Sequence, residues 1–354
     1  VDKVIAFDHM QHRAWIILAP GARQTDLGFR DITTIDWAAA YDEAEEALHD
    51  ICTFVLSAEE DGALSPETPA GQALDIIYEM KKEHYMDMVR RAKEYIAAGD
   101  IFQANLSQRI AVSIGSLDPW EIYRVLRTVN PSPFAGYVDF GDYRIVSSSP
   151  ERLVRLRRGV IDTRPIAGTR PRGRDISEDE FMRSELLLNE KERAEHIMLI
   201  DLERNDIGRV SAFGTVFVDE LMITEDYSHV IHIVSNVRGE LREGKTCYDL
   251  IRATFPGGTI TGVPKVRCME IIDELEPVRR GVYTGSLGYV GFSGDMDLNI
   301  IIRTFMVRDG FAYVQVGAGI VADSDPEREY YETLRKAEAL LKTVRTLDRR
   351  GRGA

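Results

Sequence analysis

The sequence predicts an α+β fold, in which sheets and helices are mixed without a regular strand–helix–strand repeat. Three observations support this prediction. Strand-like segments occur in adjacent runs, long helix-like segments separate those runs, and no segment repeats at a fixed period. With 354 residues, 44% of them hydrophobic, the chain can bury a large core in one or two domains.

The elements follow from hydrophobic spacing along the chain. Short runs of β-forming residues indicate strands, and apolar residues at a helical period indicate helices. Strands are predicted at 4–7, 14–18, 101–114, 134–148 (two strands), 214–218, 230–237, 282–292, 297–307 and 311–316. Helices are predicted at 35–57, 72–98, 119–129, 177–202 and 326–347, with an exposed loop at 58–73.

Several boundaries have their own signals. Gly99-Asp100 ends the second helix, and Pro119 stands near the start of the third. Gly141-Asp142 predicts a hairpin turn between two strands. The Ser-Glu-Asp-Glu stretch at 177–180 suits a helix N-terminus, where acidic groups oppose the helix dipole.

The charge balance excludes some classes of partner. The formal net charge is −14, with 58 acidic residues against 44 basic ones, which argues against nucleic-acid binding. An anionic substrate remains compatible, because a bound divalent cation can reverse the local field. No apolar run approaches the roughly 18 residues of a membrane span. We find no signal peptide, and Cys52, Cys247 and Cys268 form no metal or disulfide pattern, so we expect a cytoplasmic protein.

Two pairs of glutamates have the same spacing. Glu192 and Glu195 are three residues apart on one predicted helix, and Glu329 and Glu332 are three apart on another. Residues at this spacing project from one helical face, so two such faces could offer four oxygen ligands to Mg²⁺. Each pair taken alone also fits an ordinary solvated surface, and spacing by itself does not establish a metal site.

Other segments are open to two interpretations. Residues 255–262 and 317–320 are rich in glycine, which lets main-chain amides approach an anion, but both also fit simple turns. The histidines of 227–232 lie on a predicted strand and fit buried structural residues as well as an acid or base. The arginines of 164–174 fit a solvated loop.

Taken together and in order, these segments resemble one family, the chorismate-utilising enzymes related to anthranilate synthase component I. The matching segments are IFQANLSQR (101–109), SSSPERL (147–153), RPIAGTRPRG (164–173), NEKERAEHIMLIDLERND (189–206), YSHVIHIVS (227–235), FPGGTITGVPK (255–265), YTGSLGY (283–289), IIRTF (301–305) and GAGIVADSDPEREYYET (317–333). The resemblance implies two intertwined, mostly antiparallel sheets packed in a sandwich, with helices outside. It also implies that residues 1–75 are the remnant of an N-terminal subdomain that contributes strands to the core, and that 76–348 form the chorismate-binding catalytic domain.

The resemblance assigns roles to individual residues. Mg²⁺ would bind the ring carboxylate of chorismate and be held by Glu192, Glu195, Glu329 and Glu332. Glu151 matches the general acid that protonates the leaving C4 hydroxyl, so burial or neighbouring charge should raise its pKa. His232 matches a histidine tied to the elimination of pyruvate. The remaining matches are Thr169, in the catalytic group, and the chorismate-binding positions Gly168, Tyr283, Arg303, Gly317, Gly319 and Lys265.

Two positions separate the branches of the family. Relatives that add water to the ring use a lysine as base where this chain has Gln103, which cannot act as one. Many aminodeoxychorismate synthases attack the ring with a lysine where this chain has Ala167, which has no nucleophile. The expected reaction is therefore amination of chorismate with loss of pyruvate to give anthranilate, in tryptophan biosynthesis. An aminodeoxychorismate synthase component 1 of the folate pathway, or a fragment that binds chorismate without turnover, remains an alternative.

The resemblance also implies partners and an inhibitor. Ammonia would come as free ammonium or from glutamine through a glutaminase small subunit (component II). Asn130, Pro131, Ser132, Pro133 and Phe134 resemble a segment that helps bind tryptophan as feedback inhibitor, and a rigid turn is the alternative. Family members carry a longer N-terminal part, with a Leu-Leu-Glu-Ser-type segment that completes the inhibitor pocket. Because this sequence opens on Val1, directly before a strand, we expect the natural chain to begin earlier.

Overall fold

The computed structural model describes residues 2–19, 36–57, 74–226 and 230–352. These residues divide into two compact units, 1–65 and 66–354. The predicted loop at 58–73 and His229, one of the two histidines in 227–232, lie outside the described residues. None of the described helices combines the length and apolar character that a bilayer crossing requires.

The first unit contains a hairpin and one helix. Strands β1 (Lys3–Asp8) and β2 (Arg13–Leu18) pair antiparallel, and the Asp8 carboxylate accepts hydrogen bonds from main-chain amides of the turn. Helix α1 (Trp37–Ser57) begins after Asp36, whose side chain caps two free amides. The predicted strands and helix of this segment are confirmed. Its contribution of strands to the core of the catalytic domain stays a prediction.

The second unit is built on two seven-stranded sheets, counted over the described residues, and every pairing in them is antiparallel. The β4 sheet has the order β12-β4-β16-β15-β6-β5, with β3 also paired to β4. Its strands are β3 (Asp75–Tyr78), β4 (Gln103–Ser113), β5 (Phe134–Asp139), β6 (Arg144–Ser149), β12 (Gly262–Val263), β15 (Thr304–Arg308) and β16 (Phe311–Ile320). The α+β fold class with antiparallel sheets is confirmed.

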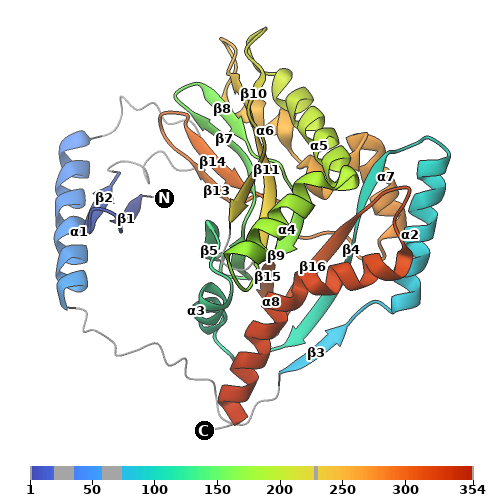
Figure 1. Ribbon diagram of the computed structural model, residues 1–354. Coiled ribbons are helices and arrows are strands. Elements are labelled where there is room, and N and C mark those ends of the chain that lie inside the picture. Colours follow the sequence, from blue (N-terminus) through green and yellow to red (C-terminus); the bar gives the residue numbers. More distant parts are fainter. Residues whose placement is uncertain (1, 20–35, 58–73, 227–229, 353–354) are drawn as a thin grey trace. The chain divides into compact units, whose positions relative to one another are not determined.

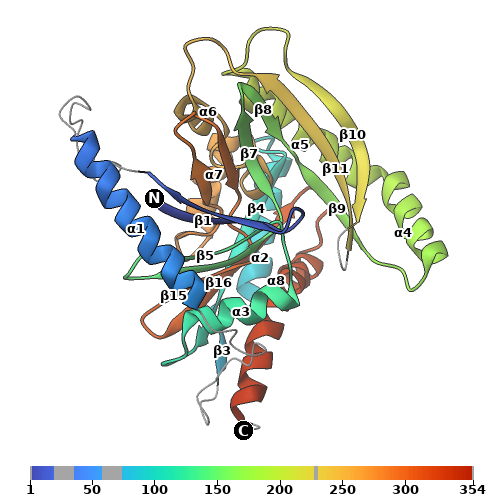
Figure 2. The same cartoon turned by 90° about the vertical axis from the view of Figure 1, so that its left-hand side faces the viewer.

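The β11 sheet has the order β10-β11-β8-β7-β14-β13, with β9 also paired to β11. Its strands are β7 (Arg152–Arg157), β8 (Val160–Thr163), β9 (Ile166–Pro171), β10 (Phe217–Asp226), β11 (Val230–Glu240), β13 (Gly288–Val290) and β14 (Met296–Asn299). Figure 2 shows β10 and β11 as a long twisted ribbon in this sheet.

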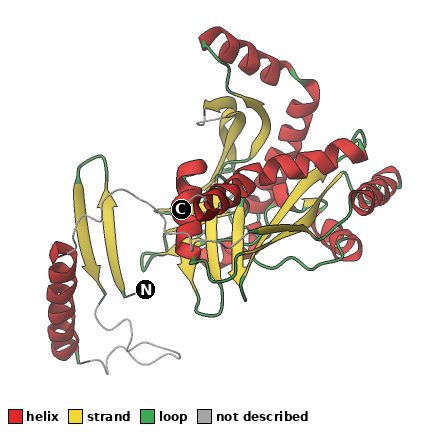
Figure 3. Cartoon of the chain, turned by 90° about the horizontal axis from the view of Figure 1, so that it is seen from below, coloured by secondary structure: helices red, strands yellow, loops and turns green. Residues whose placement is uncertain are grey.

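Helices cover the sheets (Figures 1 and 3). Helices α2 (Lys82–Ala97), α3 (Pro119–Val129), α7 (Lys265–Leu275) and α8 (Pro326–Arg352) bury their apolar faces against the β4 sheet. Helices α4 (Ile176–Leu188), α5 (Glu190–Gly208) and α6 (Cys247–Thr254) pack against the β11 sheet. A short 3₁₀ helix, η2 (Gly258–Ile260), contributes Ile260 to the core between the β11 sheet and helices α5 and α6. Burial of apolar surface in these layers is the main force that holds the two sheets in place.

Three predicted elements are wrong in their extent. The helix predicted at 72–98 begins only at Lys82, because residues 75–78 pair with β4 as a strand. The helix predicted at 177–202 is two helices, broken at Asn189, whose side chain accepts the Glu192 amide and caps α5. The strand predicted at 282–292 is reduced to β13.

Two further differences concern the bounds of strands. The strand predicted at 297–307 is divided into β14 and β15, which belong to different sheets. The strand predicted at 214–218 instead begins at Phe217 and continues to Asp226. Strands β7, β8 and β9 had no predicted counterpart. The third helix is confirmed at both ends, with Asp118 capping it and Pro119 at its first position.

Candidate functional site

Two short passages of the chain lead directly from one sheet to the other, and each carries a predicted site residue. Strand β6 continues into β7 through Glu151, and β14 continues into β15 through residues 300–303. The Ile300 amide donates to the Glu151 carbonyl at 3.0 Å, so the two passages are hydrogen-bonded to each other. Glu151 and Arg303 are therefore held at one junction, although 152 positions separate them in the sequence.

The main chain of this junction is strained at two non-glycine residues. Arg303 has a φ of +49°, and Thr284, which follows Tyr283, has a φ of +64°. Such conformations cost roughly 1–3 kcal/mol each and occur often at functional sites. Both are held by main-chain hydrogen bonds, from the Ser148 amide to the Arg303 carbonyl and from the Thr284 amide to the Ile301 carbonyl. One strained residue, Arg303, is thus a predicted chorismate-binding position, and the other directly follows one.

Glu151 lies in surroundings that suit a proton donor. It is only 9% exposed, and burial raises the pKa of its carboxyl above the ordinary value. Thr259 Oγ1 donates a 2.8 Å hydrogen bond to Glu151 Oε1, and this bond lowers the pKa. The charges of Arg303 and Lys336 lower it as well. The expected rise in the pKa of Glu151 is borne out in direction, and burial is its cause.

Lys336 is a residue of this site that the sequence reasoning missed. Its Nζ donates to the carbonyl of Gly317 at 3.1 Å, and although the residue as a whole is exposed, burial around the ammonium lowers its pKa. The positive charge of Arg303 also lowers this pKa, whereas three carboxylates raise it, those of Glu332, Glu329 and Glu151. Lys336 follows Glu332 by four residues, one helical turn along the same face of α8, and that spacing is the signal that could have identified it.

His232 lies beside Gly168 on neighbouring strands. Its Nδ1 is 3.1 Å from the Gly168 carbonyl, and the main chains of His232 and Thr169 are paired in register. Burial lowers the pKa of the imidazole, and the nearby charge of Arg303 lowers it further. The ring is therefore favoured in its neutral form, which can accept a proton. Gly168 has a φ of +63°, a conformation that explains a glycine at this position.

Two glycines of β16 allow other side chains to approach closely. A Cβ on Gly317 would lie 2.4 Å from Asn105 Oδ1 and 2.7 Å from the Tyr283 hydroxyl, and a Cβ on Gly319 would lie 2.4 Å from Gln103 Nε2. Tyr283 is buried, which raises the pKa of its phenol, so the hydroxyl keeps its proton. The structure therefore brings Tyr283 against Gly317 and Gln103 against Gly319, two residues further along β16.

The four predicted metal ligands do not form a metal-binding cluster in the part of the chain that the structure describes. Glu192 Oε1 accepts from Arg170, Glu329 Oε1 accepts from Ser324 at 2.8 Å, and Glu332 Oε2 pairs with Arg335 at 2.7 Å. Glu192 nevertheless lies next to Gly168, since a Cβ there would be 3.0 Å from its Oε2. The donor chemistry fits Mg²⁺, which prefers carboxylate oxygens. The magnesium site itself stays a prediction.

Two further groups of predicted residues have structural partners of their own. Lys265 Nζ pairs with the buried carboxylate of Asp206 at 2.6 Å and donates to the Thr254 carbonyl, so its role in chorismate binding stays a prediction. In the predicted inhibitor segment, Asn130 Nδ2 donates to Ser148 Oγ at 2.6 Å. Pro131, Ser132 and Pro133 lead into β5 at Phe134, and tryptophan binding there is likewise untested.

Comparison with known proteins identifies the family. Residues 1–342 match the profile described as chorismate binding enzyme. The chain is 49% identical to anthranilate synthase component 1 of Acetivibrio thermocellus, over 97% of this chain and 68% of that protein. It is 47% identical to aminodeoxychorismate synthase component 1 of Bacillus subtilis (strain 168), over 97% of this chain and 69% of that protein.

A solved structure supports the same relationship. Anthranilate synthase component I from Streptococcus pneumoniae TIGR4 superposes with a TM-score of 0.83 at 37% identity, covering 95% of this chain and 71% of the other. The chain thus spans about two thirds of the length of these relatives, and 58% of a Synechocystis protein described as anthranilate synthase component I-like. Sequence and fold agree, and the chain belongs to the family of chorismate binding enzymes.

Proposed function

We propose that this chain is the large subunit of an anthranilate synthase, which aminates chorismate at C2 and eliminates pyruvate to give anthranilate. The observation that supports this most is the junction of the two sheets. There Glu151 has a buried carboxyl with a raised pKa, and the charges of Arg303 and Lys336 act on that carboxyl. Chorismate carries two carboxylates, so a site that combines a proton donor with two cations suits it.

In the proposed reaction Glu151 gives its proton to the C4 hydroxyl, which leaves as water while ammonia forms a bond to C2. Arg303 would bind one carboxylate of the substrate through its planar fork. Neutral His232 would then assist the elimination step, in which the ring loses the proton at C2 and the enolpyruvyl group leaves as pyruvate. Thr169 and Gly168, paired with His232, would fix the ring edge at this position.

We further propose that Mg²⁺ is the cofactor and that Glu192, Glu195, Glu329 and Glu332 hold it. Such an ion, when bound, would neutralise and orient the ring carboxylate of the substrate. Ammonia would be supplied by a glutaminase small subunit or taken as free ammonium. The relatives that are named component 1 support the idea of a second component. A cytoplasmic location is part of the same proposal.

A second candidate function is that of an aminodeoxychorismate synthase component 1. The 47% identity to such a protein from Bacillus subtilis favours it and is nearly as high as the identity to anthranilate synthases. Ala167 argues against it where catalysis depends on a lysine nucleophile, because a methyl group cannot attack the ring. Both candidates share the use of Glu151 and differ in the product.

The experiment is an assay of the purified chain with chorismate, ammonium and Mg²⁺, with products separated by chromatography. We expect anthranilate, detected by its fluorescence, and an equal amount of pyruvate. Accumulation of aminodeoxychorismate without pyruvate would establish the second candidate. Binding of chorismate without its consumption would establish a non-catalytic fragment.

A further inference from the structure

Arg280, which lies between α7 and β13, makes an unusual number of contacts for a side chain outside the predicted site. Its Nη1 donates to the Ile260 carbonyl at 2.8 Å, and its Nη2 donates to the Asn105 carbonyl at 2.6 Å. The guanidinium also lies over the ring of Tyr283, 5.4 Å from the ring centre. One side chain thus connects β4, η2 and the segment of Tyr283.

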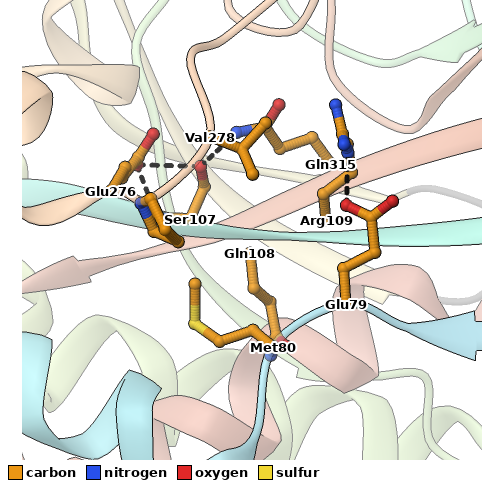
Figure 4. A pocket seen from close by; sticks show the side chains of 9 residues that line it. Glu79, Met80, Ser107, Gln108, Arg109, Glu276, Val278 and Gln315 are labelled. Carbon is orange, nitrogen blue, oxygen red and sulfur yellow. Dashed lines mark hydrogen bonds and ion pairs between the residues drawn. The ribbon is translucent and has the colours of Figure 1, made fainter.

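Glu276 holds this guanidinium in position. Its carboxylate accepts Arg280 Nε at 3.0 Å and Nη2 at 2.6 Å, a two-point pairing that fixes the plane of the fork. The same carboxylate accepts the amide and the hydroxyl of Ser107, both at 2.8 Å, and Ser107 Oγ in turn accepts from Gln315. Figure 4 shows Glu276, Ser107 and Gln315 together at a small pocket whose lining includes no predicted site residue.

The ion pair is shielded from water. The side chains of Glu276 and Arg280 are 3% and 12% exposed. A buried charge pair is weak evidence for stability, because desolvation offsets much of the attraction. Its geometry here favours another role, since both hydrogen bonds from Arg280 beyond Glu276 go to segments that contact a predicted site residue, Glu151 in one case and Gly317 in the other.

The segments that contain Ile260 and Asn105 contact the predicted catalytic and substrate-binding residues. Ile260 is the neighbour of Thr259, whose hydroxyl donates to Glu151. Asn105 lies beside Gly317, and its side-chain amide reaches the Thr259 carbonyl at 3.4 Å. Tyr283 also approaches Gly317. Displacement of the guanidinium would therefore move the hydrogen-bond donor of Glu151 and one wall of the chorismate pocket together.

We propose that Arg280, fixed by Glu276, is a positioning residue that sets the Thr259–Glu151 hydrogen bond and the orientation of Tyr283 for the reaction of chorismate. This inference rests on the proposed function. Arginine suits the task because its five N–H groups stand in one rigid plane, whereas a lysine ammonium is a single point. A lysine at 280 keeps the charge but cannot bond Glu276, Ile260 and Asn105 at once.

The test compares R280K with R279K. Arg279 is the adjacent residue, its side chain is 92% exposed, and it pairs only loosely with Asp273 at 3.7 Å, so it is a matched control. We expect R280K to lower kcat by about tenfold or more, because small misplacements of reacting groups have large effects on rate. We also expect the alkaline limb of its kcat profile to move to higher pH, because weakening of the Thr259 hydrogen bond raises the pKa of Glu151. R279K should match the wild type in both measurements.

Hydrogen exchange of residues 258–263 provides a readout that needs no turnover. Exchange should rise in R280K and not in R279K. A wild-type chain that makes no anthranilate, together with this selective rise, would sink the proposed function and leave the positioning role standing. An active R280K with the kcat, pH profile and exchange of the wild type would overturn the positioning role alone. If R280K does not fold, E276Q carries the same test, because it keeps the side-chain volume and removes the charge that fixes Arg280.

Discussion

The hydroxyl of Thr259 donates a 2.8 Å hydrogen bond to Glu151 Oε1, and this bond lowers the pKa of a carboxyl that burial raises. The balance of these two influences and of the charges of Arg303 and Lys336 decides how much of Glu151 is protonated at a given pH. Removal of the hydroxyl in T259V should shift that balance towards the protonated form. The alkaline limb of the kcat profile should then move to higher pH, whereas T259S, which keeps a hydroxyl, should leave it in place. A T259V profile that coincides with the wild-type profile would refute this relationship.

Glu151 itself should be essential for turnover. In E151Q the side chain keeps its shape but has no carboxyl proton to give to the leaving hydroxyl. We expect kcat to fall by roughly 10²- to 10⁴-fold, the usual contribution of a general acid. Chorismate binding, measured by calorimetry, should persist. E338Q, an exposed carboxylate on α8, is the control and should be unaffected. Near-normal turnover by E151Q would assign the acid to another group.

Lys336 should contribute to substrate binding. The charges of Glu151, Arg303, Glu329 and Glu332 act on its ammonium, and we expect a carboxylate of chorismate to bind there. Charge-assisted hydrogen bonds contribute about 1.5–3 kcal/mol, so K336M should raise KM for chorismate by roughly 10- to 100-fold. K342M removes an exposed lysine of the same helix and should leave KM unchanged. Equal KM values in the two variants would exclude Lys336 from the site.

The sequence and the structure differ most in this part of the molecule. The spacing of the glutamates and the segment around Glu151 were visible in the sequence. The resemblance also implies one site for Glu151 and Arg303, but the approach of Lys336 depends on the packing of α8 against β16, which the sequence does not predict. The sequence predicts one strand at 297–307, but Arg303 adopts a left-handed main-chain conformation between β14 and β15. Arginine rarely adopts that conformation, so the residue type gives no sign of the break.

Elements with strong local signals were predicted well by comparison. Helix α3 has a capping aspartate, a proline at its first position and a clear apolar face, and both of its ends were predicted. The sequence predicts a helix over the residues of β3, because four residues give too little periodicity to oppose the helical pattern that follows. Only its pairing with β4 makes it a strand. The least predictable features are therefore those that tertiary pairing decides.

Glu203 should make stability depend on pH. Burial raises the pKa of this carboxyl to about 8, with the charges of Glu151 and Asp206 adding to the effect and Thr163 and Lys265 opposing it. Because the folded-state pKa is raised, the stabilising contribution is complete below the ordinary value near 4.5 and is lost as the pH rises through 8. Each pKa unit corresponds to about 1.4 kcal/mol, so the free energy of unfolding should fall by a few kcal/mol across this range.

The variant E203Q isolates that contribution. Glutamine resembles the protonated carboxyl in shape and does not titrate. Chemical denaturation at pH 5 and pH 9 should show a smaller loss of unfolding free energy in E203Q than in the wild type. E243Q, an exposed carboxylate, should lose as much as the wild type does. The same pH dependence in all three proteins would show that Glu203 ionises normally.

The central claim is that glutamates from α5 and α8 share one Mg²⁺ ion with chorismate, and calorimetric titration of Mg²⁺ in the presence of chorismate tests it most directly. We expect one saturable site per chain in the wild type. Binding should be lost both in E195Q, on α5, and in E332Q, on α8, while circular dichroism shows both variants folded. Wild-type affinity in either variant would contradict a shared ion and remove that helix from the metal site.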